Sequence, residues 1–331
     1  MNQDLLIRLF RSIEGDKNDD IVQVANLIIT EEEKKGHVKL AEKLKGILSK
    51  NINSSQLFRG ELRKILPQGV TIPTDKRQNF PLAIPIEREE LRHEMVLPHD
   101  TEEKIHRIEK EYAAKERLAH HGLRHKQKIL LYGVPGCGKS MSAERIAWNL
   151  GLPFLKVRFD VMISSFLGET ASNLSKLFAG IKDYPCVLLF DEFDIIGKTR
   201  SNAQDVGEMH RIVNVLLTLL EEYNPKGLLI ATTNLDNALD PALFRRFDDI
   251  IEIPKPSTEE ILRLLKLTLS SIEKSRTIDW HGLAESMRGF SAALVVKVAN
   301  DAAKLAVIGN ERVLLEAHFQ KSLKENHLYL K

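Results

Sequence analysis

Residues 133–140 read Gly133-Val134-Pro135-Gly136-Cys137-Gly138-Lys139-Ser140, which fits the pattern of a glycine, four residues, then glycine, lysine and serine. In this pattern the glycines allow successive backbone N–H groups to turn inward around an anion without a Cβ in the way. The lysine places a compact positive charge against the β and γ phosphates of a nucleotide, and the serine hydroxyl is short enough to hold Mg²⁺. The stretch therefore predicts a phosphate-binding loop, or P-loop.

The flanks of the P-loop have the order that this motif needs. Lys128 to Tyr132 is a short apolar run typical of a buried strand, and Ser140 to Leu150 has a helical pattern that ends at Gly151. A helix that begins at the loop points the positive end of its dipole at the phosphates. These flanks disfavour the alternative of a chance match to the pattern.

The composition says little about what kind of molecule the protein binds. The chain has 331 residues, 43% of them apolar, with 48 basic and 46 acidic residues that leave a net charge of +2. This balance gives no support for a dedicated nucleic-acid binder or a membrane-surface protein. Neither a signal peptide nor an apolar run of about 20 residues is visible, so we expect a cytoplasmic protein without a membrane anchor.

Two cysteines, Cys137 and Cys186, exclude a disulfide framework or a cysteine-rich metal site. Cys137 lies in the P-loop beside Lys139, where backbone donors and a positive charge would favour a reactive thiolate. The alternative, which we favour, is that Cys137 is a small residue that fits the loop.

The order of apolar runs predicts the fold class. Short strand-like runs alternate with helical patterns, which indicates a parallel sheet with helices on its faces. The expected strands after the P-loop are Phe154–Phe159, Cys186–Phe190 and Leu228–Thr232, and the expected helices are Leu174–Ile181 and Ile212–Glu222. Beyond Pro256, a capping-box pattern at Ser257 to Glu260 begins a helical C-terminal third.

The part of the chain before residue 95 has a different pattern. Helical faces are expected around Val24, Leu27 and Ile28 and around Leu40, Leu44, Ile47 and Leu48, followed by a proline-bearing stretch. We therefore predict a helical N-terminal domain (1–66), a linker (67–94), a large α/β nucleotide-binding subdomain with a parallel sheet (95–254) and a small all-helical lid (255–331).

Polar residues follow two of the expected strands. Asp191 and Glu192 end an apolar run, where the first would hold the Mg²⁺ shell and the second would orient water for attack on the γ-phosphoryl group. Asn234 follows another strand, and its amide could bind both the γ-phosphate and that water. The alternative interpretation of each is a polar turn after a strand.

Together these motifs closely resemble the ATPase module of the AAA family, within the AAA+ class. The resemblance rests on Leu130-Leu131-Tyr132-Gly133, Phe190-Asp191-Glu192-Phe193-Asp194 with Gly197 and Arg200, Ala231-Thr232-Thr233-Asn234, Leu239-Asp240-Pro241-Ala242-Leu243 and, weakly, Gly289-Phe290-Ser291-Ala292. It covers residues 95–331 and leaves the N-terminal helices unassigned. It implies an ATP- and Mg²⁺-dependent ATPase.

The resemblance assigns residues to the nucleotide. Catalytic roles are implied for Glu192, Asn234, Arg245 and Arg246. Ser140 and Asp191 would bind Mg²⁺. The nucleotide-binding set is Gly133, Pro135, Gly136, Cys137, Gly138, Lys139, Ser140, Met141 and Asp191. Cys137 stands where a Thr or Ser is common, which would tune binding. The lid stretch Gly289 to Lys297 offers Lys297 but no arginine for the γ-phosphate.

Arg245 and Arg246 would be arginine fingers by the same resemblance, and their adjacency is similar to the spastin and katanin branch. On residue chemistry alone they would be a solvated loop. Such fingers act on ATP of the neighbouring subunit, where one arginine contributes about 10³ to 10⁵ in rate. The resemblance therefore implies a homo-oligomer, most simply a hexameric ring.

Phe166, Leu167 and Gly168 resemble the first pore loop of AAA unfoldases, which grips a polypeptide that threads the ring. From spacing alone, Phe166 would be a core residue. The segment 198–207 would hold a second pore loop, although any basic surface loop has a similar sequence.

The leading hypothesis is a ring-forming, Mg²⁺-dependent ATPase that remodels, unfolds or translocates a protein substrate, with the N-terminal helices selecting it and any protease acting in trans. One alternative is an ATP-dependent nucleic-acid motor or loader, which the near-neutral charge and the Phe166 segment disfavour. Another is a regulatory switch whose ATP occupancy activates a partner.

Overall fold

The computed structural model describes residues 28–29, 37, 40–42, 44–46, 72–75, 79–162, 167–194, 206–234, 241–311 and 313–326. The chain divides into two compact units, Met1–Val70 and Thr71–Lys331. In the first unit, residues 28–29, 40–42 and 44–46 are helical, in agreement with the helical pattern of the sequence. Val24, Leu27, Ile47 and Leu48, expected on the apolar helix faces, lie outside the described residues.

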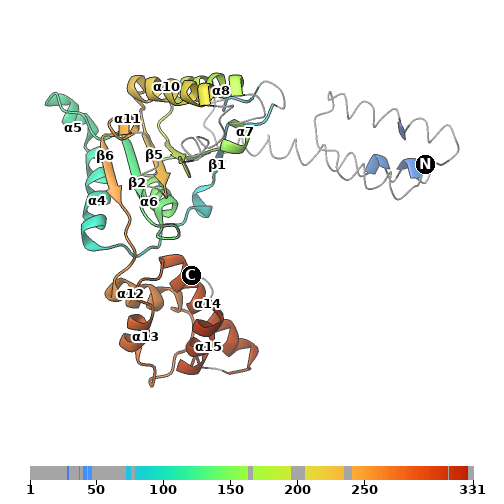
Figure 1. Ribbon diagram of the computed structural model, residues 1–331, viewed down its shortest axis with the longest axis vertical. Coiled ribbons are helices and arrows are strands. Elements are labelled where there is room, and N and C mark those ends of the chain that lie inside the picture. Colours follow the sequence, from blue (N-terminus) through green and yellow to red (C-terminus); the bar gives the residue numbers. More distant parts are fainter. Residues whose placement is uncertain are drawn as a thin grey trace. The chain divides into compact units, whose positions relative to one another are not determined.

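The second unit contains a six-stranded sheet in the order β1-β3-β4-β5-β2-β6 (Figure 1). The strands are β1 (Ala83–Ile86), β2 (Lys128–Tyr132), β3 (Phe154–Val157), β4 (Val187–Phe190), β5 (Leu228–Thr233) and β6 (Asp249–Glu252). All neighbouring strands pair in parallel except β1, which runs antiparallel to β3. The predicted α/β class with a parallel sheet is therefore confirmed.

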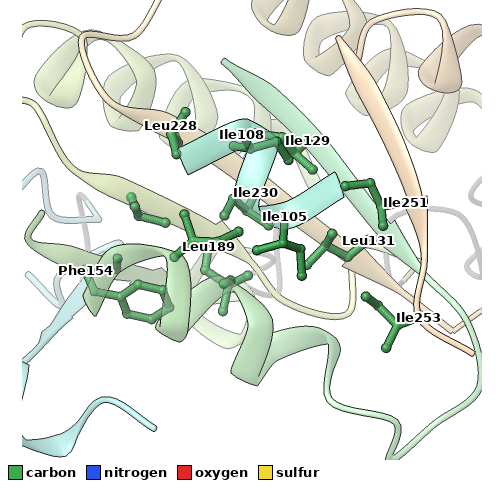
Figure 2. Packing of buried hydrophobic residues seen from close by; sticks show 14 of the residues in the cluster. Ile105, Ile108, Ile129, Leu131, Phe154, Leu189, Leu228, Ile230, Ile251 and Ile253 are labelled. Carbon is green, nitrogen blue, oxygen red and sulfur yellow. The ribbon is translucent and has the colours of Figure 1, made fainter. Parts of the chain in front are cut away.

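Helices cover both faces of the sheet. On one face, α4 (His99–Ala113) and α6 (Lys139–Leu150) share a buried cluster with alternate strand residues (Figure 2). Ile105 and Ile108 of α4 pack there among Ile129, Leu131, Leu189, Leu228, Ile230, Ile251 and Ile253. Alternation of side chains along a strand sends the intervening residues to the other face.

The other face is covered by α8 (Leu167–Ile181) and α10 (Val206–Glu222), which lie side by side (Figure 1). The ring of Phe178 on α8 lies 5.7 Å from that of Phe190 at the end of β4 and 4.7 Å from that of Tyr223. Shorter elements connect these layers: η1 (Arg88–Glu90), α5 (Lys115–His120), α7 (Phe159–Met162) and α11 (Pro241–Phe244). Both faces of the sheet are thus buried, which explains why its central strands are mostly apolar.

The C-terminal helices α12 (Thr258–Thr268), α13 (Trp280–Ser286), α14 (Ala292–Ile308) and α15 (Glu316–Asn326) gather beside the sheet region and have a core of their own (Figure 1). The capping box at Ser257 is present, because its side chain accepts from the N3 backbone and the Glu260 carboxylate accepts from Ser257 N. The helical lid expected from the sequence is therefore observed.

Four elements differ by two residues or more from the sequence expectation, among them α10, which begins at Val206 rather than Ile212. Strand β1 lies within the stretch expected to be a linker, because an edge strand tolerates a proline such as Pro85. Strand β3 ends at Val157 rather than Phe159, since Phe159 begins α7. Helix α8 begins at Leu167 rather than Leu174. The domain boundaries at residues 66, 94 and 254 remain predictions.

Candidate functional site

The P-loop connects β2 to α6 and has a backbone that only glycine adopts easily. Gly138 has a φ of +101°, and a Cβ on Gly133 would lie 2.3 Å from the carbonyl oxygen of Ile253. The buried Lys139 donates from Nζ to the carbonyl oxygens of Gly133 (2.9 Å) and Val134 (3.0 Å). Burial lowers the pKa of Lys139. The loop thus holds its lysine at the N-terminus of α6.

Asp191, which directly follows β4, collects donors from three elements. Its Oδ1 accepts from Ser140 Oγ at 2.6 Å and from Thr232 Oγ1 at 2.7 Å, and its Oδ2 lies 2.7 Å from Lys156 Nζ on β3. Burial alone would raise the pKa of Asp191, but the hydrogen bonds from Lys156, Ser140 and Thr232 outweigh it and the pKa is lowered. Asp191 is therefore an oriented, ionised carboxylate beside Ser140.

Glu192 and Asn234 lie at the same edge of the sheet. Glu192 has a positive φ of 54°, and its backbone N–H donates to Thr232 Oγ1 at 3.0 Å. This conformation is uncommon for a residue with a Cβ and leaves the Glu192 side chain exposed. Asn234 follows β5, and both side chains line the same pocket. The structure thus brings together the four polar residues Ser140, Asp191, Glu192 and Asn234.

The pocket has a volume of about 650 Å³ and two chemically different ends. Its polar lining comes from the P-loop with Asp191, Glu192, Thr232 and Asn234, and its apolar lining from Val96, Leu264, Leu267 and Val296. Met95 also lines the pocket and lies against the P-loop, since a Cβ on Gly138 would lie 3.1 Å from its Cε. The lid touches the loop directly, because Ala293 N donates to Gly136 O at 2.8 Å. A phosphate chain at the polar end and a flat, largely apolar base at the other match this division.

Comparison with known proteins agrees with this geometry. Residues 129–255 match the model of the ATPase family associated with various cellular activities (AAA). An uncharacterized AAA family ATPase of Sinorhizobium fredii, y4kL, is 35% identical over 314 residues, which cover 93% of this chain and 91% of the relative. The chain belongs to the AAA ATPase family. It is an ATP hydrolase by this membership.

Two further relatives are similar to this AAA ATPase over a shorter range. A 26S proteasome regulatory subunit 10B of Dictyostelium discoideum is 33% identical over 62% of this chain and 54% of its own length. A proteasome-activating nucleotidase of Pyrococcus furiosus is 34% identical over 59% of this chain and 51% of its own length. The chain thus spans about half the length of these two relatives. Of the helices in the described ranges, none has the length and apolarity needed to cross a membrane.

The donor set at the polar end fits a magnesium nucleotide. Ser140 Oγ and the Asp191 carboxylate are oxygen ligands of the kind that Mg²⁺ prefers, and they already lie within hydrogen-bond distance of each other. The positive-φ glycines turn backbone N–H groups toward an anion, and the N-terminus of α6 adds its dipole. Magnesium would supply charge neutralisation at the phosphates.

The two arginines of this AAA ATPase lie in the turn after α11, and neither lines the pocket of their own chain. Arg245 is exposed, whereas Arg246 forms an ion pair with Glu221 of α10 at 2.9 Å. The Nε of Arg246 is buried and has no hydrogen-bond partner among the described residues. The structure thereby distinguishes two residues that the sequence leaves equivalent.

The residues expected in pore loops are only partly described. Phe166 and residues 198–205 lie outside the described residues, while Leu167 and Gly168 belong to the first turn of α8. The pore role of Phe166, Leu167 and Gly168 therefore stays a prediction.

Cys137 is buried, and this corrects the idea of a reactive thiolate in the P-loop. Burial raises the pKa of the Cys137 thiol and outweighs the opposing effects of a hydrogen bond with the Ala292 backbone and of the Lys139 charge. Cys137 is therefore a neutral thiol at physiological pH, consistent with the interpretation of a small residue that fits the loop.

Several pocket residues were not foreseen from the sequence. They are Arg92, Glu94, Met95 and Val96 before α4, Thr232 on β5, and Leu264, Leu267, Thr268, Ala292, Ala293 and Val296 of the lid. Thr232 could have been found, because a hydroxyl at the end of the strand next to an aspartate is a natural partner for it. The others have no local signal, since tertiary packing alone brings them to the pocket.

Proposed function

We propose that this protein is a Mg²⁺-dependent, ring-forming ATPase that couples ATP hydrolysis to the remodelling, unfolding or translocation of a protein substrate. The observation that carries the proposal is the arrangement of charged groups. The pocket contains the binding groups and the candidate base Glu192 from its own chain, while Arg245 and Arg246 lie outside it.

Within one subunit, the residues divide the work on ATP. Lys139 contacts the β and γ phosphates, Ser140 and Asp191 hold Mg²⁺, and Glu192 orients the attacking water. Asn234 binds the γ-phosphate and the same water. The remaining members of the nucleotide-binding set, Gly133, Pro135, Gly136, Cys137, Gly138 and Met141, shape the loop around the phosphates.

A second copy of the chain completes the site. An arginine that cannot reach the nucleotide of its own subunit can act on that of a neighbour, which implies a homo-oligomer and most simply a hexameric ring. The adjacency of Arg245 and Arg246, as in the spastin and katanin branch, fits this assignment.

A protein substrate is the simplest client. Relatives named as a proteasome regulatory subunit and a proteasome-activating nucleotidase act with a proteolytic machine, and this chain would serve a partner in trans. Phe166, Leu167 and Gly168 would grip the substrate, and the N-terminal helices of residues 1–66 would select it. The near-neutral charge and the cytoplasmic expectation agree with this function.

The test is a substrate trap. The Glu192→Gln variant should bind ATP without hydrolysing it and should retain its client when recovered from native extract. Enrichment of a few proteins that is lost in the Glu192→Gln, Phe166→Ala double variant supports the proposal. Recovery of nuclease-sensitive nucleic acid would favour a nucleic-acid motor, and a Phe166→Ala variant that remains active on the client would favour the regulatory switch.

A further inference from the structure

A segment without regular secondary structure forms one wall of the nucleotide pocket. Residues 91–98, which we call the strap, connect η1 to α4, and both of its anchor residues, Leu91 and Leu97, are buried in the main core. Between the anchors, the strap contributes Arg92, Glu94, Met95 and Val96 to the pocket lining. A segment that lacks strand or helix hydrogen bonds needs other contacts to hold this position.

Those contacts converge on Glu144. The Arg92 backbone N–H donates to Glu144 Oε2 at 3.0 Å, Arg92 Nε donates to the same oxygen at 2.9 Å, and Arg92 Nη2 pairs with Oε1. The Glu144 side chain is only 8% exposed, whereas that of Arg92 is 60% exposed. A bidentate pair reinforced by a backbone donor is geometrically strict, and the buried carboxylate depends on it for compensation.

Glu144 lies one helical turn after Ser140 on α6, so the pair ties the strap to the helix that begins at the P-loop. The strap then reaches the apolar end of the pocket. Ser142 Oγ lies 3.9 Å from Met95 Sδ, and Val96 packs against the core of the lid. Met95 and Val96 therefore line the same pocket as Leu264 and Leu267 of α12, which supply apolar surface for the base.

We propose that Arg92 and Glu144 are a pair of positioning residues that holds the strap against α6 and so keeps the base end of the pocket in shape. The pair acts on the nucleotide through Met95 and Val96, whereas the phosphates are bound chiefly by the P-loop and the residues around Asp191. This inference rests on the proposed binding of an adenine nucleotide in this pocket. It predicts that loss of the pair weakens binding of a nucleotide more than binding of a bare phosphate chain.

The experiment compares ADP with inorganic tripolyphosphate, which has phosphates and no base, by calorimetric titration of the full-length chain in excess Mg²⁺. Arg92→Met and Glu144→Met should each raise the Kd for ADP about tenfold and leave the Kd for tripolyphosphate within about twofold. The double variant should be about as weak as either single variant, because both remove the same interaction.

Arg145→Met is the matched control. Arg145 is the next residue of α6 and pairs with Glu102 of α4, a contact of similar kind that does not line the pocket. It should lower the thermal unfolding temperature and leave the Kd for ADP unchanged. Circular dichroism checks that each variant is folded, and Glu144→Met carries the test should Arg92→Met fail to fold.

Four results would overturn the proposal: equal loss of ADP and tripolyphosphate binding, no loss of either, additive effects in the double variant, or the same selective loss of ADP in Arg145→Met. Failure of the unaltered, folded chain to bind ADP would instead refute nucleotide binding in this pocket, so the two failures are distinguishable.

Discussion

Lys156 Nζ lies 2.7 Å from Oδ2 of Asp191, while the hydroxyls of Ser140 and Thr232 bind Oδ1 of the same carboxylate. This lysine adds a second positive charge, besides Lys139, next to the proposed magnesium ligands. A unit charge at about 4 Å contributes ~1 kcal/mol in a well-solvated site. We therefore expect Lys156→Gln to lower the Mg²⁺ concentration for half-maximal ATP hydrolysis about fivefold, measured by Mg²⁺ titration at fixed ATP.

Lys126→Gln is the control for this prediction, because Lys126 pairs with Asp249 away from the pocket. It should leave the Mg²⁺ requirement unchanged. A higher Mg²⁺ requirement in Lys156→Gln would show that the lysine holds Asp191 in place rather than competing with the metal ion.

Substitutions of Arg245 and Arg246 should differ in their effect on stability. Arg245→Ala should lower ATP turnover about 10³-fold with no change in thermal unfolding, because its side chain is exposed. Arg246→Ala should also lower the free energy of unfolding, by up to about 1 kcal/mol, since it loses the ion pair with Glu221. Turnover assays and thermal melts measure both effects.

Mixing tests whether Arg245 acts in trans. Lys139→Ala and Arg245→Ala subunits are each inactive alone, but a mixed assembly contains interfaces with an intact P-loop on one side and an intact arginine on the other. Part of the activity should return on mixing. Mixtures as inactive as their components would contradict action on a neighbouring subunit.

The thiols should be protected in the folded state. Burial raises the pKa of Cys137, and it raises that of Cys186 to about 12. A pH of 8 lies below the pKa values of both thiols, so both remain neutral. Neutral thiols react poorly with disulfide reagents. We expect slow reaction with a chromogenic disulfide before addition of urea and fast reaction of both afterwards. A rapid stoichiometric reaction of the native chain would refute this expectation.

Gly136 should not tolerate a side chain, because it lies against the lid. It has a φ of +75°, and a Cβ there would lie 3.1 Å from both Ser291 Oγ and the Ala293 Cβ. Gly136→Ala should therefore weaken ADP binding and make the lid more susceptible to limited proteolysis. Gly289→Ala is matched, because its φ is +85° and its Cβ would meet open space. Gly289→Ala should lose a similar amount of folding free energy, about 1–2 kcal/mol, through its left-handed backbone, and it should keep its affinity for ADP. Equal affinities in the two variants would argue against a contact between lid and loop.

Local patterns predicted the centre of the fold well. Strand β2 has the predicted bounds Lys128–Tyr132, and the capping box at Ser257 begins α12, because apolar runs and caps are encoded by neighbouring residues. The acidic residue after an apolar run predicted that Asp191 would share a magnesium site with Ser140, because the strand ends of a parallel sheet meet at one edge. The two side chains are hydrogen-bonded in the structure.

What the sequence did not reveal depends on contacts between distant residues. Strand β1 is four residues long and contains Pro85, so only its pairing with β3 identifies it. The contact between Arg92 and Glu144 joins residues 52 positions apart, and neither has a motif. The burial of Cys137 likewise follows from packing, which the charge pattern around it does not predict.

Strand β1 has a mechanical consequence. It is the first strand after the N-terminal unit, and it lies at the sheet edge against β3, whose other neighbour β4 leads directly into Asp191. Tension applied to the chain ahead of residue 83 would act on the β1–β3 hydrogen bonds as well as on the contact between Pro73 and Gly180 of α8. A load held by the N-terminal helices would therefore be transmitted to the sheet two strands from the carboxylate beside Ser140.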